Sequence, residues 1–194
     1  MKKKIALLMA MVMLFAVTTA GTLAWLRDES TEVVNTFTVG DINIELDESD
    51  DLDLKMVPGA ELEKDPFVTV KAGSEASYVF IQVTESTNLD DFITYQVIEN
   101  GTTPVNHWTP LEGVEGVWYC QVGDLTAENA QDVVIHILVG DEVSVKEDVT
   151  KTELNALTSA TYPTLTFKAY AVQSENLNTT DMVEIWNIAK TADA

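Results

Sequence analysis

The chain has 194 residues, with 32 acidic residues against 11 basic ones and a formal net charge of −21. This charge argues against nucleic acid and anionic lipid as partners, because both would be repelled. A single cysteine, Cys120, excludes an intramolecular disulfide, and its place in an apolar, strand-like run predicts a buried and inert thiol.

The N-terminus has the pattern of an export signal. Lysines at 2–4 precede an unbroken apolar run over 5–17, which matches the core of a signal peptide. Small residues predict cleavage after Ala24, with Ala20 as the alternative site. A retained membrane anchor is the rival interpretation, because no charged residue occurs over 5–26. Both interpretations place the rest of the chain outside the cytoplasm, so we expect a secreted or cell-surface protein.

Cleavage after Ala24 would leave a strongly acidic chain. It removes three lysines and no acidic residue, so the net charge falls from −21 to −24. The ordinary effect of so many carboxylates is solubility. Self-association of such a chain is also expected to depend on salt, pH or divalent cations.

Alternation of apolar and polar residues predicts short β-strands along most of the remaining chain. In chain order, the expected strands are 35–39, 42–46, 67–71, 78–84, 92–99, 117–122, 133–139, 143–145 and 164–173. The apolar phase changes at Gly40, which predicts a bulge or a corner. Because no βαβ alternation is present, the pattern predicts an all-β protein, an antiparallel jelly-roll-like β-sandwich.

Two short helices are expected within this β-rich chain. The first lies over 150–157, where hydroxyl residues precede Glu153. The second lies over 182–190, where Asp181 and Glu184 have the spacing of a capping box. In the second helix, three apolar residues are expected to pack on the sandwich: Ile185, Trp186 and Ile188.

Catalytic motifs are missing from the sequence. No HExxH zinc motif and no G-x-S-x-G nucleophile motif occurs. His107 lies in a predicted loop, and His136 lies in a predicted strand with its side chain directed opposite to its apolar neighbours. A surface position is the ordinary interpretation of each, and a zinc pair completed by carboxylates is the alternative. The sequence therefore predicts a protein that is not an enzyme, with no catalytic and no metal-binding residue.

The acidic run Asp47–Asp53 could supply oxygen ligands to calcium. It lacks the central glycine and the terminal glutamate of an EF-hand loop. A solvated loop between strands is therefore favoured, with a calcium site as the alternative, and no cofactor is expected.

The opening residues "KKKIALLMAMVMLFAVTTAGTLAWLRDES", followed by "NTFTVGDINIEL", resemble exported proteins with a SipW-dependent signal peptide, the TasA and camelysin (CalY) family of Gram-positive bacteria. Segments 56–83 and 162–173 and the terminal "EIWNIAK" are also similar to this family. Residues 86–160 are the least similar part.

The resemblance implies a jelly-roll-like domain that a SipW-type signal peptidase processes and that polymerises into extracellular biofilm-matrix fibres. It also implies that the new N-terminus pairs with the next copy as a donor strand. Carried onto this chain, the signal peptide is 1–24, the donor is 25–36 and the single β-sandwich domain is 37–194. The residues expected to dock are Trp25, Leu26, Arg27, Val33 and Val34. Contact with a membrane is expected only through the uncleaved signal segment.

Alternatives to this assembly remain open at the level of sequence. The arm over 25–36 could be disordered or docked on its own domain. Some camelysin-like members are described as metallopeptidases, but no catalytic residue is carried over because this chain has no zinc motif. A third alternative is a monomeric cell-surface binding module that uses exposed aromatic residues such as Trp108 and Trp118.

Overall fold

The computed structural model describes residues 41–48, 55–99 and 108–191. All of them lie in one compact unit, Val39–Ala194. The expected strand over 35–39 and the phase change at Gly40 lie outside the described residues.

Most of the regular secondary structure in the described residues is β-strand. In chain order the elements are β1 (Ile44–Glu48), β2 (Glu61–Glu63), β3 (Pro66–Val70), β4 (Ser77–Glu85), α2 (Leu89–Phe92), β5 (Ile93–Thr94), β6 (Thr109–Pro110), β7 (Val117–Val122), β8 (Val133–His136), the 3-10 turn η1 (Val139–Asp141), β9 (Glu142–Val145), α3 (Lys151–Ala156), β10 (Leu165–Gln173) and α4 (Met182–Thr191).

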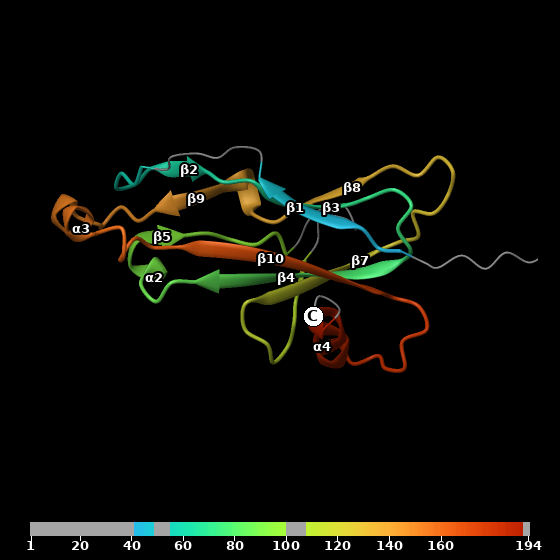
Figure 1. Ribbon diagram of the computed structural model, residues 1–194. Coiled ribbons are helices and arrows are strands. Elements are labelled where there is room, and N and C mark those ends of the chain that lie inside the picture. The colour runs from blue at the N-terminus through green and yellow to red at the C-terminus, as the bar shows by residue number, and fades with distance from the viewer. Residues whose placement is uncertain (1–40, 49–54, 100–107, 192–194) are drawn as a thin grey trace, which may run out of the picture. The chain divides into compact units, whose positions relative to one another are not determined.

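The strands form three antiparallel sheets with the orders β1-β3-β8, β10-β4-β7-β6 and β2-β9-β5. Figure 1 shows β1, β3 and β8 on one side of the sandwich and β10, β4 and β7 on the other. The prediction of an all-β antiparallel sandwich with short helices is confirmed.

One large apolar core joins the three sheets. It contains buried residues from each sheet, among them Val68, Ile81 and Val143. A second, smaller cluster lies on the other face of β4, where Phe80 packs with Ile185 and Trp186 of α4. Strand β4 is therefore covered on both faces, which accounts for its nearly continuous apolar sequence.

Helix α3 begins with a complete capping box. The Thr150 hydroxyl accepts from the Glu153 N–H, and the Glu153 carboxylate accepts from the Thr150 N–H. Helix α4 is capped differently from the expected box. Asp181 Oδ1 accepts from the Val183 N–H at 2.9 Å, but the Asp181 N–H donates to the Thr179 hydroxyl.

Helix α4 packs on the sandwich through a slightly different set of residues from the one expected. Ile185 and Trp186 are buried as predicted, but Ile188 is 43% exposed and Ala189 is buried in its place. The prediction for Ile188 was wrong because residue 189, four positions after 185, lies on the same helical face.

Two expected strands are shorter than their sequence pattern predicted. The segment over 92–99 begins as the end of α2, and only Ile93–Thr94 form a strand, with a single further bridge at Val97. The regular strand expected over 133–139 ends at His136, but extended backbone continues to Leu138, which bridges Val97. The chain then turns at Gly140 and Asp141, where φ is positive. Strands β2 and β6 were missed, since segments of two or three residues carry no measurable alternation.

Candidate functional site

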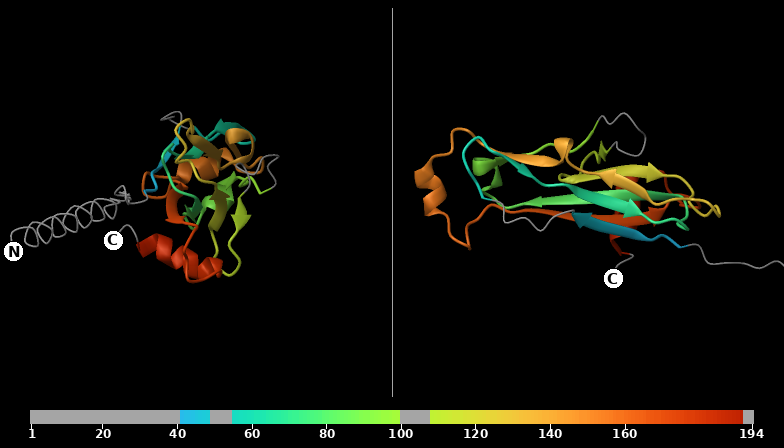
Figure 2. Two further views of the ribbon diagram at one scale, coloured as in Figure 1. Left: turned by 90° about the vertical axis from the view of Figure 1, so that its right-hand side faces the viewer. Right: turned by 90° about the horizontal axis from the view of Figure 1, so that it is seen from above.

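The most distinctive feature for function is a pair of sheet edges that face each other. Among the described strands, β1 pairs only with β3, and β10 pairs only with β4. Strands β1 and β10 are nevertheless neighbours, and both views of Figure 2 show them side by side. We call this line of contact, which has no main-chain pairing between the described residues, the β1–β10 seam.

The hydrogen bonds at the two ends of β10 show which of its residues bond to β4 and which face away from it. The Ser86 N–H donates to the Thr164 carbonyl at one end, and the Ser174 N–H donates to the Ala76 carbonyl at the other. Hydrogen-bonded pairs alternate along an antiparallel ladder, so the even-numbered residues of β10 bond to β4. The odd-numbered residues direct their N–H and C=O groups away from β4, toward the seam; they are Leu165, Phe167, Ala169, Ala171 and Gln173.

The same reasoning applies to β1. The Lys71 N–H donates to the Asn43 carbonyl, so odd-numbered residues of β1 bond to β3. The backbone groups of Ile44, Leu46 and Glu48 therefore face away from β3. At Glu48 the outward N–H is already taken, because it donates to the Asp47 carboxylate at 2.8 Å. The open part of the β1 edge is thus Ile44 to Leu46.

The apolar side chains along the seam are only partly covered. Ile44, Leu46 and Phe167 pack against the large core but keep intermediate exposure. By contrast, Val68 in β3 and Ile81 in β4 are 0% exposed. The core is therefore less completely closed along the seam than in the middle of either sheet.

Other sheet edges are short or blocked. Strand β8 has four residues, β2 has three and β5 has two, and β6 has two residues of which one is Pro110. Short edge strands and prolines are the devices by which proteins prevent unwanted strand pairing. Strand β10, with nine residues, is the longest edge strand in the described part of the chain.

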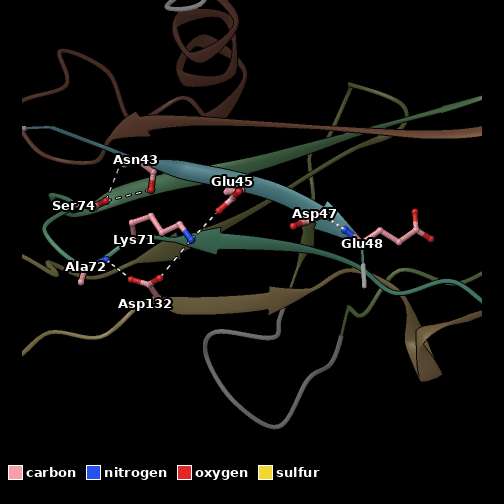
Figure 3. A network of polar contacts seen from close by, with 8 residues as sticks. All are labelled: Asn43, Glu45, Asp47, Glu48, Lys71, Ala72, Ser74 and Asp132. Carbon is pink, nitrogen blue, oxygen red and sulfur yellow. Dashed lines mark hydrogen bonds and ion pairs between the residues drawn. The ribbon is translucent and has the colours of Figure 1, made fainter. Parts of the chain in front are cut away.

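An ion-pair network lies on the sheet that contains β1 (Figure 3). Lys71 Nζ is 2.8 Å from Glu45 Oε2 and 3.5 Å from Asp132 Oδ2. The hydrogen bond with Glu45 and the nearby charge of Asp132 raise the pKa of Lys71. Asp132 also accepts from the Ala72 N–H at 2.8 Å. The network links β1 to the residue that follows β3 and the residue that precedes β8, on an exposed surface.

An open, acidic hollow of about 340 Å³ is lined by Glu85, Asp90, Tyr95, Glu99 and Trp118, among others. The Tyr95 hydroxyl donates to Glu85, and Trp118 Nε1 donates to Glu99 Oε1 at 3.1 Å. Partial burial and, after it, the Glu85 hydrogen bond raise the pKa of Tyr95. The Tyr95 hydroxyl and the Trp118 indole N–H thus already donate to carboxylates that line the hollow, so neither donor is left for a ligand.

The predicted assembly residues lie outside the described part of the chain. Cleavage site Ala24 and donor residues Trp25, Leu26, Arg27, Val33 and Val34 all precede residue 41, the first described residue. Most of the acidic run, 49–53, also lies outside. The donor strand therefore stays a prediction, while the structure describes a surface that could accept such a strand.

The histidines give no metal site in the described residues. His107 is not among them. His136 is 40% exposed at its side chain, as expected, and its Nδ1 lies 3.1 Å from Asp141 Oδ1. Within 41–48, 55–99 and 108–191, no group of three His, Cys, Asp or Glu side chains is placed to hold a metal ion.

Trp108 corrects the expectation of an exposed aromatic surface. Its side chain is 0% exposed, and its Nε1 donates to the His136 carbonyl at 2.8 Å. The residue therefore belongs to the core and cannot bind a surface ligand. Sequence alone missed this because a lone aromatic residue in a loop has no periodicity that would reveal its burial.

Cys120 in β7 is 4% exposed, and its burial raises the thiol pKa from 9.0 to about 12. Because the thiolate is the reactive form, iodoacetamide at pH 8 is expected to alkylate native protein roughly a thousandfold more slowly than free cysteine. Mass spectrometry after timed labelling would measure this, with urea-unfolded protein as the reactive control. Native labelling at the control rate would contradict the burial of Cys120.

No described helix has the length and apolar character needed to cross a membrane. Comparison of the chain with protein-family models gave no match, and comparison with curated protein sequences gave none.

Proposed function

We propose that this protein is a secreted structural subunit that assembles into extracellular fibres, in which residues 25–36 of one copy pair as a strand with the β1–β10 seam of the next. The observation that carries the proposal is the seam itself. It combines the longest described edge strand with partly covered core side chains. An added strand would form main-chain hydrogen bonds and cover apolar surface together, as in known strand-addition complexes.

Two kinds of contact would favour such pairing. Each added main-chain hydrogen bond contributes about 1 kcal/mol net. Each apolar side chain that becomes buried, from Trp25 or Leu26 on the donor, contributes roughly 1.5 to 3 kcal/mol. These gains oppose an association cost of about 4 to 15 kcal/mol. Repulsion between highly acidic copies adds to that cost, so assembly is expected to respond to solution conditions.

Removal of the donor tests the proposal directly. We expect the chain over 25–194 to form fibres in electron micrographs and the chain over 37–194 to stay monomeric by sedimentation. A chain with residues 25–36 in scrambled order keeps length and charge, and it is the matched control. Fibres of the same form from all three chains would refute the donor role.

The acceptor side can be tested with one substitution. Ala169→Pro removes an N–H that faces the seam and not one that bonds to β4, so the sandwich is expected to fold and assembly to stop. Circular dichroism would verify folding of this variant, while Ala169→Ser is the control that keeps the N–H. Normal fibres from a folded Ala169→Pro protein would exclude the β10 edge as the acceptor.

A further inference from the structure

A lysine lies at one end of the β1–β10 seam. Lys64 lies between β2 and β3, and its Nζ is 2.9 and 2.8 Å from the two carboxylate oxygens of Glu48, the last residue of β1. The same ammonium lies 5.9 Å from the ring centroid of Phe167 in β10. A single side chain therefore contacts both strands of the seam.

Lys64 is more buried than the lysine of the other ion-pair network on the described surface. Its side chain is 17% exposed, compared with 35% for Lys71 in the network of Figure 3. Removing an ammonium from water is unfavourable unless a carboxylate compensates for the lost hydration, and Glu48 supplies both oxygens. The Lys64 N–H also donates to the Asp141 carbonyl at 2.8 Å, which holds the residue from the other side. The ion pair with Glu48 and the main-chain bond to Asp141 therefore fix the position of Lys64.

The position of Phe167 connects this contact to assembly. Phe167 is one of the residues whose backbone groups face the seam, and its ring is partly buried against the core. A strand that pairs with the outward groups of β10 would place its own side chains next to that ring. The Lys64 ammonium and the incoming strand would then compete for the same apolar surface.

We propose that Lys64 is a latch on the acceptor seam: bound to Glu48 and lying against Phe167, it closes the seam in the free subunit and must move before a strand can enter. The inference rests on the proposed function, since it assigns a regulator to the same surface. The latch restrains assembly of free subunits, because the ion pair must open first. It also identifies Glu48 as a positioning residue that acts through Lys64.

Two substitutions that change the net charge in opposite directions test the latch. Lys64→Met keeps the aliphatic stem and makes the chain more negative, whereas Glu48→Gln keeps the shape and makes it less negative. Both break the same ion pair, so both are expected to shorten the lag of fibre growth by about fivefold. The double variant is expected to match the single variants, because the pair can be broken only once. Light scattering with electron microscopy would measure the lag.

Lys71→Met is the matched control. It causes the same charge change as Lys64→Met in an ion pair on the exposed network of the same sheet. Its lag is expected to stay within about twofold of the unmodified chain. Equal effects of Lys64→Met and Lys71→Met, or opposite effects of Lys64→Met and Glu48→Gln, would show that net charge controls assembly and would overturn the latch.

Hydrogen exchange in the monomer separates the latch from fibre formation. Lys64→Met is expected to speed exchange of the Asp47 and Thr166 amides, which bond to β3 and β4, by about fivefold, while the Val79 amide in the middle of its sheet is unchanged. Faster exchange at these amides with no fibres from any variant would support the latch and refute the assembly. Fibres with unchanged exchange and unchanged lag would refute the latch and leave the assembly standing.

Discussion

Replacing Trp108 with alanine is expected to lower the free energy of unfolding by about 3 to 5 kcal/mol. The side chain is 0% exposed in the large core, and its loss leaves a cavity that the neighbouring strands cannot fill. Its Nε1–H also satisfies the His136 carbonyl, which would lose its bonding partner. Urea denaturation followed by circular dichroism would measure the change.

Trp118→Ala is the control for this prediction. Trp118 is partly exposed, and its indole N–H donates to Glu99 in the acidic hollow. Its loss is expected to cost about 1 kcal/mol, because solvent replaces much of what is removed. Equal destabilisation by the two substitutions would contradict the central position of Trp108.

Trp186→Ala is expected to detach α4 from the sandwich and to cost about 3 to 5 kcal/mol. The indole meets Tyr170 edge-on at 5.0 Å between ring centroids and Phe80 at 5.4 Å, and Lys190 lies 4.9 Å above it. Aromatic pairs of this kind add stability beyond the area they bury. Trp186 is therefore the main anchor of the helix.

Hydrogen exchange would distinguish detachment from global unfolding. In Trp186→Ala, amides of α4 are expected to lose protection while those in the middle of β3 keep theirs. Ile188→Ala, at a residue that is 43% exposed on the same helix, is the control and should change little. Full protection of α4 in Trp186→Ala would show that other contacts hold the helix.

The sequence predicts those parts of the fold in which alternation is long and regular. Strands β4 and β10 were expected because nine residues of alternating or continuous apolar character leave little ambiguity. The segment 92–99 was expected to be one strand, but Leu89 and Ile93 are buried four positions apart in and after a helical turn. Period two and period four cannot be separated over so few residues.

The candidate site, by contrast, could not be predicted from local sequence patterns. Nothing local in the sequence marks Lys64, whose contacts come from β1 and β10, at opposite ends of the described chain. Likewise, an edge strand has the same alternation as an inner strand, so the seam could be found only once the sheet order was known. The donor residues were proposed from a resemblance, and they stay a prediction.

The difference in length among the sheet edges bears on the form of the polymer. If β10 is the acceptor and the other described edges are too short or blocked, each subunit gives one strand and receives one. Such head-to-tail contacts that do not close generate an open filament. The filament would be unbranched and its two ends would differ chemically, one with an empty seam and the other with a free arm. A subunit without residues 25–36 could still bind to a free arm, and it would stop growth at that end.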